Sequence, residues 1–381
     1  MANKNKKNIV KVFGVASFLN DVGSDMIAPI WPLFVVSLGA NMSILGLIDG
    51  MGEAIVSISQ AISGYISDKL RRRKVFVWTG YLMGSLSRIG YSLSTSWIYL
   101  VPLKILDRFG KIRGSPRDAM IADSVEMRER GYSFGFLRMM DNAGAFAGVF
   151  ITLVLIHFID IRNIILIAAF PSIISTILIY IFIKEKRYKK IYKGISLNNL
   201  SKNFRLFLLS GSIFALASFS YSFLIIYANN SRIEKVFVPA LYLLFTLFAS
   251  LSSIPFGKLA DRIGRKITMQ ISYLLFVCMC IITLINSLIS VILVFILYGL
   301  HKGSLETVQR TFISELSEKR YRASTLGAYR MVTGFLALPA SIIAGLLWET
   351  ISWETTFIFA AILASISTLL LHRVKETLEA R

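Results

Sequence analysis

Apolar residues occur along this chain in runs that are long enough to cross a membrane. A helix needs about 20 apolar residues to span the hydrocarbon core of a bilayer, and runs of that length recur through the whole sequence. Their approximate ranges are 11–37, 43–67, 75–94, 97–119, 132–157 and 161–183 in the first half, and 204–229, 236–259, 267–285, 288–313, 322–346 and 352–372 in the second. The pattern predicts an all-α polytopic membrane protein with twelve transmembrane helices, six in each half.

The composition agrees with a membrane protein. Of the 381 residues 55% are hydrophobic, and the mean hydropathy of +0.64 exceeds that of ordinary soluble domains. The net charge of +20 raises the question of a nucleic-acid partner, but the basic residues lie in short clusters between apolar runs and form no continuous basic face. We therefore expect the lipid bilayer, and no nucleic acid, to be the macromolecular surroundings of the chain.

The basic clusters also predict the orientation in the membrane. One set of connections carries most of the lysine and arginine, whereas the other set offers only Arg162, Arg232 and Lys235. Basic connections stay on the cytoplasmic side, so we expect a multi-pass protein of the cell membrane with both termini in the cytoplasm. The connection 184–203 has seven basic residues and one acid, which predicts a basic cytoplasmic linker between bundles at 1–183 and 204–381.

Two segments of the chain are repeated. GYISDKLRRRK at Gly64–Lys74 returns as GKLADRIGRK at Gly257–Lys266, which aligns Gly64 with Gly257 and Asp68 with Asp261 at a spacing of 193 residues. ERGYSFGFLR at 129–138 similarly returns as YRASTLGAYR at 321–330, at a spacing of 192. Repeats at one interval predict two pseudo-symmetric six-helix bundles that descend from one unit.

The copy at Gly257 resembles the cytoplasmic signature of the major facilitator superfamily, Gly-x-Leu-Ala-Asp-Arg/Lys-x-Gly-Arg/Lys-Arg/Lys. The first copy is looser, because Ile66, Ser67 and Arg71 stand where the signature has Leu, Ala and the second Gly. With the twelve runs, the resemblance covers nearly the whole chain. The segments 18–29 and 106–124 look like those of a prokaryotic branch of efflux-type permeases.

The resemblance implies a cavity lined by spans 1, 4, 7 and 10, with alternating access by rocking of the two bundles. It implies that Asp68 sits at the start of span 11, near Ala323 and Ser324, and that Asp261 sits at the start of span 5, near Ser133. Both aspartates would then hold the cytoplasmic side shut. The gating residues that it implies are Gly64, Asp68, Arg72, Gly257, Asp261, Arg262, Gly264 and Arg265.

Ionisable residues inside the spans are candidates for function, because each costs about 2.5–3.5 kcal/mol to insert. Asp21 and Asp25 are four residues apart on one face of span 1, near the midplane. A carboxylate in a low dielectric binds a proton more readily, which favours proton coupling. The alternative is a fixed salt bridge from these acids to Lys104 or Arg108 of span 4.

Further charges extend this set. We expect Glu53 of span 2 to lie in the membrane and its neighbour Asp49 to be solvated near the outer surface. The cations of span 4, among them Lys104 and Arg108, form a stripe along that helix. This stripe either binds an anionic substrate or neutralises the acids of span 1. Arg138 with Asp141, and Glu306 with Arg310, have the spacing of pairs within one helix. The full set of coupling or substrate candidates is Asp21, Asp25, Glu53, Lys104, Asp107, Arg108, Arg138, Asp141, Glu306 and Arg310.

Proline and glycine predict where the helices bend and touch. Pro29 and Pro32 should break span 1 just outward of its acids. Gly144 and Gly148 give span 5 a small-residue face for close helix packing. Drug exporters of the resembled family have Gly-x-x-x-Gly-Pro here, whereas this sequence has Val149 in place of the proline.

These patterns favour a secondary transporter that exports an amphipathic or drug-like compound in exchange for protons. An alternative is a transporter of organic anions or metabolites that uses Lys104 and Arg108, and an alternative of another class is a non-transporting membrane sensor. An enzyme is not expected, because the sequence has no zinc-protease, Walker or serine-elbow motif. We expect a monomer without metal or organic cofactor, driven by the proton gradient and bound to a small-molecule substrate.

Overall fold

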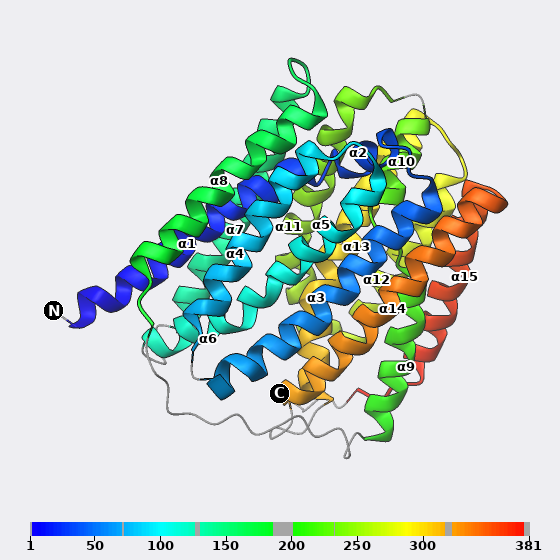
Figure 1. The fold of residues 1–381 in the computed structure, drawn as a ribbon. Coiled ribbons are helices and arrows are strands. Elements are labelled where there is room, and N and C mark those ends of the chain that lie inside the picture. The colour runs from blue at the N-terminus through cyan, green and yellow to red at the C-terminus, as the bar shows by residue number, and fades with distance from the viewer. Residues whose placement is uncertain are drawn as a thin grey trace. The chain divides into compact units, whose positions relative to one another are not determined.

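A computed structural model describes residues 2–70, 72–125, 130–185, 201–231, 233–316 and 322–376, and these residues are almost entirely helical (Figure 1). The helices of the first half are α1 (Ala2–Ile27), α2 (Trp31–Ser37), α3 (Met42–Leu70), α4 (Lys74–Leu93), α5 (Trp97–Phe109), the 3-10 turn η1 (Gly110–Arg113), α6 (Gly114–Ser124), α7 (Arg130–Leu155) and α8 (Ile161–Phe182).

The helices of the second half follow the same order. They are α9 (Lys202–Ala217), α10 (Ser222–Asn230), the turn η3 (Lys235–Phe237), α11 (Val238–Ile263), α12 (Arg265–Thr283), α13 (Leu288–Glu315), α14 (Arg322–Thr350) and α15 (Trp353–His372). The predicted all-α fold is confirmed, and every predicted span corresponds to one helix or to one interrupted helix.

Three spans are interrupted, and local sequence accounts for the first. The chain leaves α1 after Ile27 and enters α2 at Trp31, with Pro32 in the first turn of α2, where a missing N–H costs nothing. The predicted break at Pro29 and Pro32 is confirmed. The other interruptions are η1 between α5 and α6, and the turn at 218–221 between α9 and α10.

The chain forms two compact units. One holds Met1–Ala40 and Ile55–Gly194, and the other holds Asn41–Ala54 and Ile195–Arg381. The sequence predicted that all of 1–183 forms the first bundle. Residues 41–54 differ from this prediction, because they group with the second unit. The predicted linker 184–203 lies mostly outside the described residues, at 186–200.

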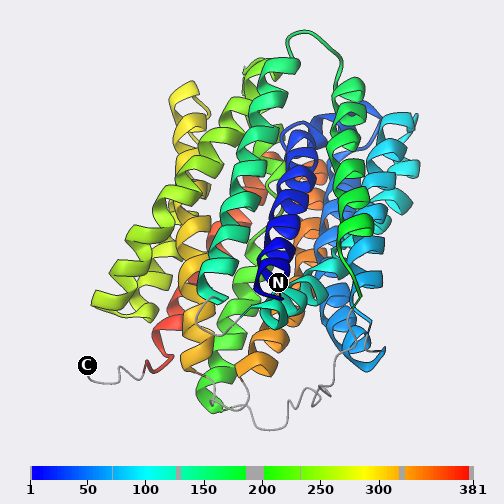
Figure 2. The same cartoon turned by 90° about the vertical axis from the view of Figure 1, so that its left-hand side faces the viewer.

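In the first unit α1 packs between α7 and α8, as Figures 1 and 2 both show. Gly144 and Gly148 make this contact close: a Cβ at Gly144 would lie 3.0 Å from the Cα of Phe18, and one at Gly148 would lie 2.9 Å from the backbone N of Met26. The predicted small-residue face of span 5 is therefore confirmed, and Val149 beside it is fully buried. In the second unit α13 packs against both α11 and α12, and α15 packs against α9 and α12.

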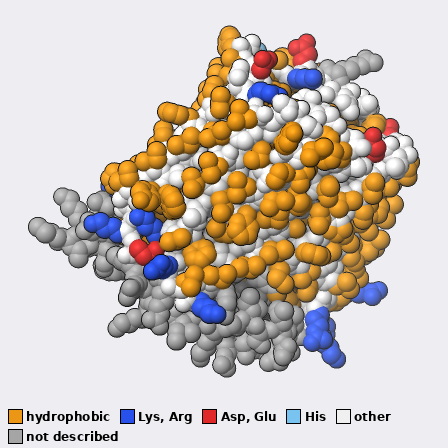
Figure 3. All heavy atoms as spheres, viewed as in Figure 1, with side chains coloured by type: hydrophobic (Ala, Val, Ile, Leu, Met, Phe, Trp, Pro, Cys, Tyr) orange, Lys and Arg blue, Asp and Glu red, His pale blue; other side chains and the backbone are white. Residues whose placement is uncertain are grey.

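Nine of the described helical segments are long and apolar enough to cross a membrane. The three spans outside this set begin with α1, α4 and α5; those of α1 and α5 contain the candidate charges Asp21, Asp25, Lys104, Asp107 and Arg108. On the face drawn in Figure 3, hydrophobic side chains cover most of the surface and charged ones lie towards its margins. The chain is thus a multi-pass membrane protein in which charge is confined to particular helices.

Candidate functional site

The acids of span 1 lie on one half-buried face of α1. Asp21 accepts a hydrogen bond at Oδ1 from Nδ2 of Asn20, at 2.9 Å. Asp25, one turn further on, interacts electrostatically with Lys111, Arg88 and other cations of the first unit. Both interpretations of these acids, proton coupling and a fixed salt bridge to Lys104 or Arg108, stay predictions.

Arg88 on α4 is the buried cation that reaches α1 directly. Its side chain donates from Nη2 to Oγ of Ser24 at 2.7 Å and to Oδ1 of Asn20 at 3.4 Å, and the residue is 2% exposed. Its other nitrogen, Nη1, is buried and has no hydrogen-bond partner among the described atoms. Asn20 therefore links Arg88 to Asp21. Sequence spacing gives no sign that Arg88 would lie beside these acids, because they belong to different spans.

The span 4 cations divide into two groups. Lys104 is 4% exposed and its Nζ lies 3.8 Å from the centre of the Trp31 ring, a cation–π contact that holds it inside the unit. Arg108 instead lies beside its neighbour Asp107, with Nε and Oδ2 3.8 Å apart and each side chain about one-fifth to one-quarter exposed (24% and 20%). The predicted stripe is thus interrupted: Arg108 remains accessible, and Lys104 does not.

A second polar network joins α1, α4, α6 and α7 closer to the predicted cytoplasmic side. Arg117 donates from Nη1 to Oγ of Ser17 at 2.8 Å, and Ser17 is 3.3 Å from the hydroxyl of Tyr81. Asp141 interacts electrostatically with Arg117 and with Arg138 of its own helix, in line with the predicted pairing on α7. One carboxylate oxygen of Asp141 is buried and has no hydrogen-bond partner in the described part of the chain. Arg117 was missed by the sequence reading because it lies at the end of span 4, where a basic residue is read as interfacial.

In the second unit the expectation for Asp49 of span 2 was wrong. Asp49, expected to be solvated, is 7% exposed and accepts hydrogen bonds at Oδ2 from Oγ of Ser220, at 2.8 Å, and from Oγ of Ser222. Glu53 and Glu306 are exposed, and both interact electrostatically with Lys302 of α13. The reason is the interruption of span 7, which turns two serine hydroxyls towards Asp49. The side chain of Arg310 lies outside the described residues.

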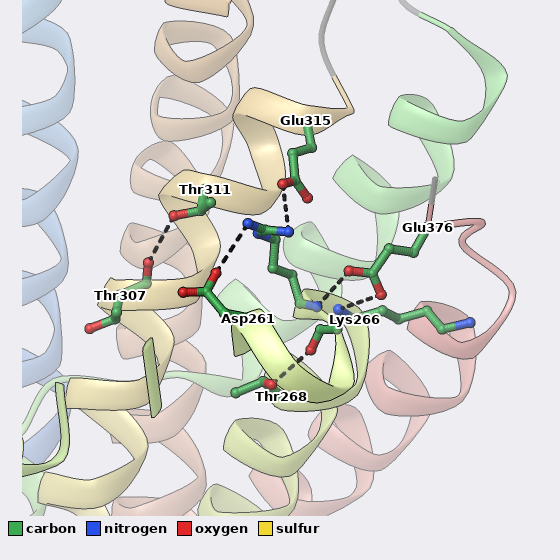
Figure 4. Close-up of polar contacts among 9 residues, drawn as sticks. Asp261, Lys266, Thr268, Thr307, Thr311, Glu315 and Glu376 are labelled. Atoms are coloured by element: carbon green, nitrogen blue, oxygen red, sulfur yellow. Dashed lines mark hydrogen bonds and ion pairs between the residues drawn. The ribbon is translucent and has the colours of Figure 1, made fainter. Parts of the chain in front are cut away.

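The repeated segment at Gly257 builds a polar cluster at the turn between α11 and α12 (Figure 4). Arg265 donates from Nη1 to Oε1 of Glu315 at 2.7 Å and from Nη2 to Oδ1 of Asp261 at 3.4 Å. Glu376 accepts from the backbone N–H of Arg265 at 2.5 Å and of Lys266 at 3.2 Å. A carboxylate at a helix N-terminus satisfies free N–H groups and complements the helix dipole. Glu376 thereby ties the segment that follows α15 to the start of α12.

Gly264 is required at this turn. Its φ of 98° lies where residues with a side chain are strained, and a Cβ there would meet Oε2 of Glu376 at 2.7 Å. Of the remaining signature residues, Arg262 is exposed and Gly257 approaches Thr307 of α13.

Burial raises the pKa of Glu315 above its ordinary value of 4.5, and the charge of Arg265 offsets this only in part.

The first copy builds the same cluster with different residues. Arg73 donates from Nη1 to Oδ2 of Asp123 at 2.7 Å, and Glu185 accepts from the backbone N–H of Arg73 and Lys74, each at 2.9 Å. Nζ of Lys74 donates to the carbonyl of Tyr180, and Nζ of Lys266 donates to the carbonyl of His372.

The two clusters correspond at a spacing of 192 residues, not 193. Arg73 with Arg265, Asp123 with Glu315, and Tyr180 with His372 are each 192 positions apart. The first copy has no glycine at the turn and contains one more residue between its aspartate and its arginine. Arg73, which is 6% exposed, therefore occupies the place that the alignment gave to the exposed Arg72. The side chain of Asp68 lies outside the description, and the cytoplasmic contacts implied for Asp68 and Asp261 stay predictions.

Comparison with known proteins agrees with this geometry. The family model described as Major Facilitator Superfamily matches residues 13–233 and 206–381. An uncharacterized MFS-type transporter of Methanocaldococcus jannaschii is 40% identical over 385 residues, covering 97% of this chain and 96% of the relative. The multi-drug resistance efflux pump PmrA of Streptococcus pneumoniae is 25% identical over 284 residues, covering 70% of each chain.

Solved structures show the same fold at low sequence identity. A bacterial homologue of the human lysosomal transporter Spinster, in an inward-facing and unoccupied conformation, has a TM-score of 0.78 at 12% identity and covers 97% of this chain and 98% of its own. The nucleoside transporter NupG has a TM-score of 0.79 at 14% identity, with coverage of 97% and 100%.

Proposed function

Because the chain belongs to the major facilitator superfamily and is a membrane transporter rather than an enzyme, we propose that it moves a small organic solute across the cell membrane by alternating access. The proton gradient drives this movement. The direction is export, and the substrate is an amphipathic or drug-like compound. Both termini face the cytoplasm and the working unit is a monomer.

One observation carries the proton coupling: two half-buried carboxylates, Asp21 and Asp25, share a helix face, and several cations of the first unit act electrostatically on Asp25. Nearby cations favour the charged form of a buried carboxylate, so such a carboxylate gains or loses a proton when the cations move. Asp25 interacts electrostatically with three cations, Lys111, Arg88 and Arg108. A small movement of α5 relative to α1 would therefore change its charge state.

The two clusters around Arg73 and Arg265 support alternating access. Each one fixes the start of the third span of its half to the end of the sixth, through Glu185 in one and Glu376 in the other. Such contacts make each half stiff at its cytoplasmic end, so that the halves move as bodies. Asp68 and Asp261 then act as gating residues at the cytoplasmic surface.

Export of an amphipathic compound is favoured over transport of an organic anion. The similarity to PmrA, named a multi-drug resistance efflux pump, supports export. Lys104, which the anion hypothesis needs, is covered by Trp31 and is 4% exposed. Arg108 alone remains as an accessible cation of that pair, and Asp107 stands beside it.

A thermal-shift screen of the purified protein in detergent, against a library of cationic, neutral and anionic compounds at pH 6 and pH 8, tests the proposal. A ligand at about 100 times its Kd stabilises the native state by about 2.7 kcal/mol, enough to raise the melting temperature measurably. We expect amphipathic cationic or neutral compounds to stabilise the protein, and more strongly at pH 8 if Asp25 must be free of its proton. Stabilisation by anions only would contradict the proposed substrate class.

A further inference from the structure

Aromatic side chains of the second unit form a continuous row. The ring centres of Tyr221, directly before α10, and Tyr242 of α11 lie 5.4 Å apart. Phe245 continues the row, with its ring centre 5.4 Å from that of Tyr242 and 5.0 Å from that of Tyr298 on α13. Tyr221 and Phe245 are half-buried, so part of the row is accessible. Rings at these spacings offer an apolar surface on which another flat ring can stack.

The row is fixed by close packing of α13 on α11. A Cβ at Gly299 would lie 2.6 Å from the carbonyl oxygen of Phe245, and one at Gly303 would meet the carbonyl oxygen of Ala249. Helices that touch through glycines approach closely. Tyr298, the neighbour of Gly299, is thereby brought against Phe245, and the row is part of the packed interior of the unit.

An ammonium group lies at the α13 end of the row. Nζ of Lys302 is 5.6 Å from the centre of the Tyr298 ring, one helical turn away, which is within the range of a cation–π interaction. Glu306, one further turn along α13, and Glu53 of α3 both interact electrostatically with Lys302 and with Tyr298. An aromatic face and two carboxylates therefore surround one ammonium group. These are the groups that recognise organic cations in proteins.

The two acids have capacity for a second cation. Glu53 and Glu306 are exposed, whereas Lys302 is half-buried. Each carboxylate has about four lone-pair sites, and one ammonium group fills only some of them. Charged side chains within spans face the interior of a bundle or a water-filled cavity, so these acids are accessible from water rather than from lipid. All of these residues belong to the second unit, which comprises 41–54 and 195–381.

We propose that the row of rings, together with Glu53 and Glu306, is a binding site for a flat organic cation, and that Lys302 is a tethered competitor for it. The ring of the ligand stacks on Tyr221 and Phe245, and its positive charge takes the place of the Lys302 ammonium beside the two acids. The long flexible stem of lysine lets the ammonium withdraw. The inference rests on the proposed function, because it names the class of compound that the transporter carries.

Binding of ethidium, a flat aromatic cation, to the purified full-length protein in detergent tests the site without any transport. The fluorescence anisotropy of ethidium is followed as protein is added, and the signal of empty micelles is subtracted. We expect Lys302→Met to lower the Kd about tenfold, because it removes a like charge from the site. Glu53→Gln should raise the Kd about tenfold, the factor for loss of a charge-assisted contact. Lys302→Arg keeps the positive charge and should not tighten binding.

The matched control is Glu234→Gln, the same substitution at an exposed acid of the second unit outside this site, and it should leave the Kd for ethidium unchanged. Phe245→Leu removes one ring of the row but keeps an apolar side chain. It should weaken the binding of ethidium more than that of tetrapropylammonium, a cation without rings, measured by displacement of ethidium. This second comparison covers the case in which Glu53→Gln does not fold.

The outcomes separate the binding site from the proposed function. Equal Kd values of wild type, Lys302→Met and Glu53→Gln would overturn the site. Weaker binding by Lys302→Met would overturn the role of Lys302 as a competitor. Binding that follows all of these expectations, in a protein that does not move ethidium across proteoliposome membranes, would support the site and contradict the proposed export.

Discussion

Arg73 and Arg72 are adjacent arginines whose replacement is expected to lower stability by different amounts. Arg73 is 7% exposed in its side chain, bonds Asp123 at 2.7 Å and lies at the start of α4, whereas Arg72 is exposed. Replacing Arg73 with alanine leaves Asp123, whose side chain is 43% exposed, without this partner. A fully buried pair would cost about 3–5 kcal/mol to break and an exposed one about 0.2–1 kcal/mol. We therefore expect a loss of about 1–2 kcal/mol for Arg73→Ala and less than about 0.5 kcal/mol for Arg72→Ala.

Thermal unfolding of the purified variants in one detergent, followed with a thiol-reactive dye or by light scattering, measures the difference. At about 2–4 °C per kcal/mol for a unit of this size, Arg73→Ala should melt about 2–8 °C below wild type and Arg72→Ala within about 2 °C of it. Arg265→Ala, in the matching position of the second half, should resemble Arg73→Ala. Equal melting temperatures for the Arg73 and Arg72 variants, or a larger loss for Arg72→Ala, would refute the 192-residue correspondence.

Three other substitutions test single contacts. Gly264→Ala should lower stability by about 1–3 kcal/mol, because φ of 98° is unfavourable for alanine and its Cβ would meet Glu376; unchanged melting would contradict this turn. Gly148→Val should reduce the folded yield in membranes, since its side chain would enter the backbone of α1, and a normal yield would argue against that close contact. The native state holds the proton of Glu315 more tightly than the unfolded chain does, so stability should fall as the pH rises from about 4.5. Glu315→Gln should flatten this dependence, and an unaltered slope in melting experiments across that range would assign it to another group.

The fold was predictable because each of its determinants is local. Apolar runs of sufficient length predicted all twelve spans, and Pro29 with Pro32 predicted the break after Ile27. The repeat gave the two halves, but not the packing of 41–54, because that contact depends on glycines of α3 and α14, which are almost 300 residues apart in sequence, meeting in space.

The candidate site was predictable only in part. Charge position identified Asp21 and Asp25, but which cation pairs with which acid depends on side-chain direction and on polar neighbours such as Asn20 and Trp31. Asp49 was misjudged because depth along a helix does not show that a neighbouring span is interrupted there. The alignment of Arg72 with Arg265 failed for a related reason: one additional residue in a turn shifts every later position.

The most direct test of proton coupling is flux through purified protein in proteoliposomes. With a pH gradient imposed and ethidium as the probe, wild type should accumulate the probe against its gradient, and Asp25→Asn should lose this accumulation while it still exchanges probe for probe. Full gradient-driven accumulation by Asp25→Asn would contradict the account, since the carboxylate at the centre of the cation cluster would then carry no coupling proton.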